Sequence, residues 1–129
     1  MKPQDVSLET APVVGHYELT VLPATDLGGG NWEIPVNTPF FLLAHVEFPG
    51  GDPVTKGTAV FQSFFSGRWH RIDAAGVNQD GEVRFGFAGV GFCGGVPLPL
   101  ARFKYIAQGS GVKNGVSNSV TVHTEPCGS

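Results

Sequence analysis

The chain has 129 residues, of which 41% are hydrophobic and 15% charged, with a formal net charge of −3. These values exclude a highly charged disordered chain and fit one domain that can bury a core. The charge balance offers no clustered basic patch for nucleic acid or anionic lipid. Because no apolar run reaches about 18 residues, no membrane insertion is expected.

Glycine or proline interrupts almost every candidate helix, whereas apolar and polar residues often alternate with a period of two. In chain order, the expected strands are 16–23, 40–48, 58–65, 68–72, 82–87, 101–108 and 116–124. This pattern predicts an all-β protein, an antiparallel two-sheet sandwich of about seven strands, with a closed barrel as the alternative. Residues 1–12 are expected to form an N-terminal extension or first edge strand, and 13–129 a single domain.

The segment 64–87 contains a histidine, a tryptophan and several charged side chains, which raises the question of a reactive site. Two turn signals in the segment favour a structural interpretation over a reactive site. Ser66-Gly67 predicts a two-residue turn, and Asp80-Gly81 is a hairpin-type signal before the next strand. We therefore interpret the segment as strands and turns. The expected core is Leu42, Ala44, Val46, Phe61, Phe85, Phe87, Phe103, Tyr105, Val120 and Val122.

Two cysteines, Cys93 and Cys127, allow either one disulfide or two free thiols. The disulfide is favoured, because Cys93 lies in a glycine-rich loop and Cys127 near the chain end, where neither resembles a core residue. A bridge would indicate an oxidising compartment. A free Cys93 would instead be a candidate nucleophile, but no basic pair or helix N-terminus is visible to activate it. No enzymatic activity is expected.

Three further motifs have simpler structural interpretations. "GVGFCG" (89–94) matches a dinucleotide-binding pattern, but the prolines that follow it prevent the required helix. "NQDGE" (78–82) lacks the spaced ligands of a calcium loop, although a site between loops using Asp52 or Asp73 stays open. The histidines lack zinc-ligand spacing. No cofactor and no metal are expected.

The segments "GTAVFQSFFSGRWHRI", "NQDGEVRFGF", "ARFKYIAQGSG" and "GVSNSVTVH" resemble the bacterial immunoglobulin-like domains of secreted and surface proteins. The resemblance covers about residues 58–124. The insert 88–100, the cysteine pair and Lys104 in place of the usual arginine depart from the family pattern. The resemblance implies an immunoglobulin-like sandwich that is secreted or displayed at the cell surface. It also implies a spacer, adhesion or protein-binding role, with another protein or a cell-surface component as partner.

A candidate binding surface is expected on the solvent-facing side of the strands that carry the resemblance. Its residues are Phe64, Trp69, Arg102, Lys104 and Ile106, with Phe41 and Leu43 outward on another strand. If contiguous, they would mark a partner or glycan surface; the alternative is that one set packs under the long loop or a neighbouring domain. A carbohydrate-binding sandwich that uses Trp32 or Trp69 for stacking is the second functional hypothesis.

Overall fold

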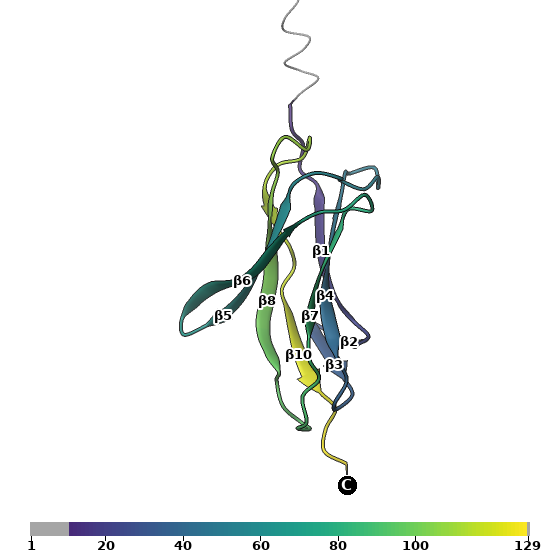
Figure 1. Cartoon of the computed structure of the whole chain (residues 1–129), viewed down its shortest axis with the longest axis vertical. Helices are drawn as coiled ribbons and strands as arrows, with labels where there is room; N and C mark the ends of the chain where they lie inside the picture. Colours follow the sequence, from purple (N-terminus) through teal and green to yellow (C-terminus); the bar gives the residue numbers. More distant parts are fainter. Residues whose placement is uncertain (1–10, 129) are drawn as a thin grey trace, which may run out of the picture.

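The structure of the chain, a computed structural model, describes residues 11–128 and consists of strands without helices in that range (Figure 1). The strands are β1 (His16–Leu22), β2 (Thr25–Gly28), β3 (Asn31–Ile34), β4 (Phe40–Glu47), β5 (Thr58–Phe65), β6 (Arg68–Gly76), β7 (Glu82–Phe87), β8 (Leu98–Ile106), β9 (Gly115–Val116) and β10 (Val120–Thr124). Residues 1–10 of the expected extension lie outside the described range. Val13 forms a bridge with Val112. No helix long and apolar enough to span a membrane occurs in residues 11–128.

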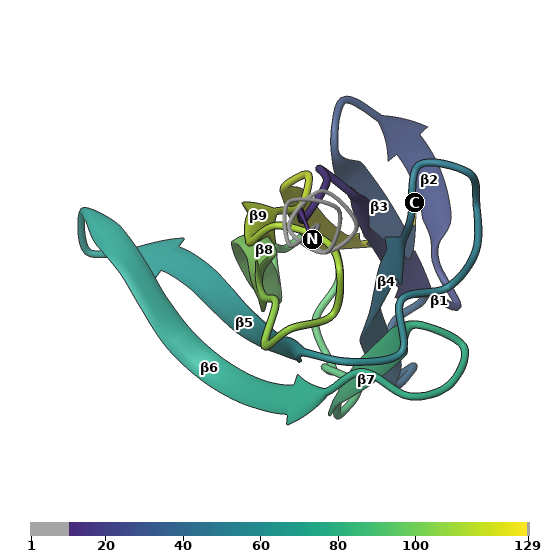
Figure 2. The same ribbon diagram turned by 90° about the horizontal axis from the view of Figure 1, so that it is seen from above.

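The strands form two sheets that face each other in a sandwich-like arrangement (Figures 1 and 2). The smaller sheet has the order β1-β4-β7, and the larger has the order β2-β3-β10-β8-β5-β6, with β9 on β8. The prediction of a wholly antiparallel sandwich is wrong at one pair, because β3 and β10 run parallel. Parallel pairing is possible there because a long connection separates the two strands in the chain.

The core lies between the inner faces of the two sheets. Along β4, buried and half-buried residues alternate without interruption, as a strand covered on one side requires. The ring of Phe61 in the larger sheet lies 5.7 Å from that of Phe85 in the smaller sheet and 6.3 Å from that of Phe103. Most of the predicted core is buried. Phe85 and Phe87 are only partly buried, because β7 is an edge strand.

The strand predictions need three kinds of correction. The β2–β3 hairpin was missed, because its strands have four residues each and are joined through glycines with positive φ. The strand expected at 68–72 continues to Gly76, and the strand expected at 101–108 spans 98–106.

The third correction concerns the strand expected at 116–124, which is split into β9 and β10. Ser117 interrupts it: its N–H donates to Phe103 O (3.0 Å), and its Oγ accepts from Phe103 N (2.9 Å). These two bonds hold the segment against β8 before β10 begins. The break therefore comes from a side-chain hydrogen bond.

The predicted turn at Ser66-Gly67 is confirmed as a two-residue hairpin loop. Both residues have positive φ, 52° and 78°, as a type I′ turn requires.

At Asp80-Gly81 the turn is present, but the hairpin interpretation is wrong. Asn78 Oδ1 accepts from Asp80 N (2.8 Å) and Glu82 N (3.0 Å), and the turn carries the chain from β6 in one sheet to β7 in the other.

The disulfide between Cys93 and Cys127 is present, with 4.9 Å between the two Cα atoms. It joins the loop before β8 to the segment after β10. A backbone bond from Gly94 N to Glu125 O (2.7 Å) reinforces the same junction. The last strand of the larger sheet is therefore anchored covalently to the long loop.

Candidate functional site

The five predicted binding residues lie on the outer side of the larger sheet. Their positions follow from strand register: Phe64 pairs with Trp69, Gln62 with Arg102, Val60 with Lys104, and Thr58 with Ile106. Side chains alternate along a strand, so these rows face away from buried Ala59, Phe61 and Ser63. The cationic face is defined here as Val60, Gln62, Phe64, Trp69, Arg71, Arg102, Lys104, Ile106 and Val116.

Trp69 is the centre of a stacked group on this face. The guanidinium carbon of Arg102 lies 3.8 Å from the centroid of the Trp69 ring, and the Phe64 ring meets Trp69 edge-on at 5.4 Å. Arg102 Nε also donates to Gln62 Oε1 (2.9 Å). Cation–π contact and this hydrogen bond orient the guanidinium plane. An ordered, half-buried arginine beside aromatic rings is therefore presented to solvent.

The cations of this face have no carboxylate partner in the part of the chain that the structure describes. The only ion pair found in residues 11–128 joins His45 Nε2 and Glu47 Oε2 on the opposite sheet, at 3.6 Å. Arg71 and Lys104 are exposed. A locally positive surface thus stands on a chain whose net charge is −3.

The β5–β6 hairpin extends the cationic face beyond the body of the sandwich (Figures 1 and 2). β5 pairs with β8 only as far as Ser63, so Phe64 and Phe65 continue without a partner on that side. Both are substantially exposed, at 37% and 46%. The projecting hairpin places aromatic side chains where another molecule can reach them.

Phe41 and Leu43 do not belong to the same patch. They lie on β4, with side chains on the outer side of the smaller sheet, and Arg84 covers the Phe41 ring at 4.9 Å. The possibility of one contiguous surface with Phe64 and Trp69 is therefore wrong. The sequence showed that both sets face outward, but not that they belong to opposite sheets.

The two tryptophans form no common stacking platform. Trp32 pairs with Val122 on the inner side of β3 and packs against the core. Trp69 faces the outer side and is covered by Arg102. Stacking of a sugar between or across two exposed indole rings is not available in this arrangement.

Cys93 cannot act as a thiolate nucleophile while it is bonded to Cys127. The loop 89–94, with its dinucleotide-like glycine pattern, leads through the disulfide into β8 and not into a helix. Among residues 11–128, no group of three or more His, Cys, Asp or Glu side chains is arranged to hold a metal ion, and this includes Asp52 and Asp73.

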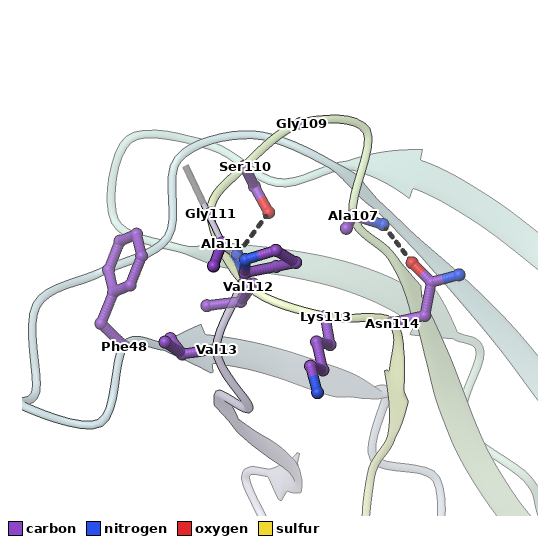
Figure 3. Close-up of a pocket in the computed structure, with 11 residues that line it drawn as sticks. Ala11, Val13, Phe48, Ala107, Gly109, Ser110, Gly111, Val112, Lys113 and Asn114 are labelled. Carbon is purple, nitrogen blue, oxygen red and sulfur yellow. Dashed lines mark hydrogen bonds between the residues drawn. The ribbon is translucent and has the colours of Figure 1, made fainter. Parts of the chain in front are cut away.

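One pocket was not anticipated from the sequence. It lies at one end of the sandwich, has a volume of about 990 Å³, and is lined by residues 11–13, Phe48, Ala107 and the loop 109–114 (Figure 3). Two of its polar side chains are engaged by nearby backbone: Asn114 Oδ1 accepts from Ala107 N (2.8 Å), and Ser110 Oγ accepts from Val112 N (3.4 Å). The pocket is mainly apolar and open, with Lys113 as its one charged lining residue.

Comparison of the chain with protein families, with curated proteins and with solved structures finds no match.

Proposed function

We propose that the chain is a non-catalytic immunoglobulin-like module, secreted or displayed at a cell surface, that binds another protein through the cationic face. The observation that carries this proposal is the group formed by Trp69, Arg102 and Phe64, with exposed Arg71 and Lys104 beside it. Tryptophan and arginine are the residue types most enriched among the energetic centres of protein interfaces.

The strand order supports the immunoglobulin-like assignment. In that fold, strands A, B and E share one sheet, while C, F and G share the other. Assigning β1, β4 and β7 to A, B and E, and β5, β8 and β10 to C, F and G, reproduces this division. Several features differ from antibody domains. The smaller sheet has no fourth strand, and β2 and β3 extend the larger sheet beyond β10. The disulfide lies outside the core, and β5 has a buried Phe61 and no tryptophan.

The disulfide supports the proposed location. Such bonds persist in oxidising compartments and are rare where glutathione and thioredoxin reduce thiols. Carbohydrate binding, the alternative function, has weaker support, because Arg102 already covers one face of the Trp69 ring and Trp32 packs against the core.

Site-specific photocrosslinking in the source cells tests the proposal. In the test variant, a photoreactive amino acid replaces Val116, which is 47% exposed and lies on the cationic face. In the control variant, the same amino acid replaces Leu27, which is exposed on β2. A protein adduct formed from position 116 and absent from position 27 is expected. Adducts of equal yield at both positions, or none at position 116, would contradict a binding role for this face.

A further inference from the structure

The cationic face contains a charged row that runs straight across three strands. Gln62 on β5 pairs with Arg71 on β6 and with Arg102 on β8, so the three side chains form one row on the outer side. Adjacent strands lie about 4.8 Å apart, which separates the Cα positions of the two arginines by roughly 10 Å. The Arg102 guanidinium leans from β8 over Trp69 on β6, towards Arg71. Lys104 lies two residues beyond Arg102 on the same side of β8.

The smaller sheet has a row of the same design with opposite charge. His45 on β4 pairs with Glu18 on β1 and with Glu82 on β7, again in one row on the outer side. The Cα positions of the two glutamates have the same separation of about 10 Å. Glu47 lies two residues beyond His45 on the same side of β4, and its carboxylate is 3.6 Å from His45 Nε2.

The acidic face is defined here as the outward residues of β1, β4 and β7: His16, Glu18, Thr20, Leu22, Phe41, Leu43, His45, Glu47, Glu82, Arg84 and Gly86. Arg84 is its only Lys or Arg, and lies over the Phe41 ring. Its negative charges therefore concentrate on the Glu18 row and Glu47.

We propose that the partner of the cationic face is the acidic face of a second copy of this chain, an inference that rests on the proposed binding role of the cationic face. Glu18 and Glu82 of one copy face Arg71 and Arg102 of the other, with His45 opposite Gln62. In the orientation that brings Glu47 towards Lys104, the apolar row of Phe64 and Trp69 meets the row that contains Leu43. Charged rows then meet charged rows. The row of Thr20, Leu43 and Arg84 contributes one apolar residue, Leu43, to the contact with Phe64 and Trp69.

The two complementary faces lie on opposite sides of the sandwich, which determines the type of assembly. Each copy bound through one face still offers the other, so the contact is heterologous and does not close into a symmetric dimer. The expected product is a front-to-back stack that lengthens with concentration. Because its contacts are charge pairs at a surface, the stack weakens as salt rises.

Sedimentation velocity of the full chain tests this inference. At low ionic strength, between about 10 μM and about 1 mM, the range of weak association, the average mass should rise past that of a dimer and fall when salt is added. Two neutralised variants should each associate at least about tenfold more weakly than the unmodified chain. They are Arg71→Gln/Lys104→Gln and Glu18→Gln/Glu82→Gln.

An equimolar mixture of these two variants gives the sharpest result. The first variant has an intact acidic face and a weakened cationic face, and the second variant has the reverse. The mixture should therefore form mainly a one-to-one complex, since further growth needs a weakened face. All four substituted residues lie at outward strand positions, so circular dichroism should show unchanged folding.

A chain that stays monomeric over the whole range would overturn the inference, as would association that only one of the two variants abolishes. Neither result would remove the proposed function. If position 116 crosslinks to a different protein while the chain stays monomeric, the cationic face binds a foreign partner. If position 116 crosslinks to nothing, the proposed function fails.

Discussion

Tyr105 is the largest fully buried side chain of the described residues and joins several segments. Its hydroxyl donates to the backbone oxygen of Lys56, and its ring stacks on Tyr17 with 5.7 Å between centroids. Burial raises the pKa of the Tyr105 hydroxyl above its usual value of 10.0, with a smaller opposing contribution from a hydrogen bond to Ser110. The fold thus favours the neutral phenol.

This pKa shift predicts a loss of stability at alkaline pH. Because the pKa is higher in the folded chain, the stabilisation is fully present below the unfolded pKa of about 10 and declines as pH rises through the folded value. Urea unfolding between about pH 8 and pH 11 should show the free energy falling. In Tyr105→Phe the fall should be shallower; an identical slope in both proteins would count against the shift.

Gly57 is required at its position for two reasons. Its φ is 107°, and a Cβ there would overlap the hydroxyl and ring of Tyr105. Gly57→Ala should therefore reduce the free energy of unfolding by roughly 2 kcal/mol or more, since it adds backbone strain to overpacking. Gly50 is the matched control: a Cβ added there would have no neighbour within 4 Å, and its φ is not positive. Gly50→Ala should change stability by less than about 1 kcal/mol in chemical denaturation, and equal losses in both variants would contradict this account.

At the scale of elements, the Cys93–Cys127 bond holds the end of β10 and the long loop together across 34 residues of sequence. In the chain-entropy model, a loop of this length contributes roughly 3–4 kcal/mol. Cys93→Ser/Cys127→Ser should lower the denaturation midpoint accordingly. Intact mass provides the direct check: the native protein should be about 2 Da lighter than the reduced protein and resist alkylation. Two readily alkylated thiols in fresh native protein would contradict the bridge.

At the scale of the whole molecule, Phe61 joins the two sheets through its contacts with Phe85 and Phe103. Phe61→Ala should cost about 3–5 kcal/mol by leaving a cavity between the sheets. Phe65 is four residues further on the same strand and 46% exposed, stacked only on His70. Phe65→Ala should therefore cost less than about 1 kcal/mol. Urea unfolding of both variants measures the two losses in the free energy of unfolding. Similar losses for Phe61→Ala and Phe65→Ala would mean that the core extends into the projecting part of β5.

The sequence by itself determined the local structure of this chain. Period-two alternation located β1, β4, β5 and β7 closely, because alternation is a direct consequence of strand geometry. Residues with positive φ explain the turn at Ser66-Gly67. The same alternation also identified Phe64, Trp69, Arg102, Lys104 and Ile106 as outward-facing, which their register bears out.

Only the tertiary structure decided which strands share a sheet, because alternation gives the side of a strand and not its neighbours. It separated Phe41 and Leu43 from Trp69 by placing them on opposite sheets, and it turned the Asp80-Gly81 turn into a crossing between sheets. The rows Arg71–Gln62–Arg102 and Glu18–His45–Glu82 likewise exist only through pairing of distant strands. Long-range register depends on packing of the whole core, which no local pattern encodes.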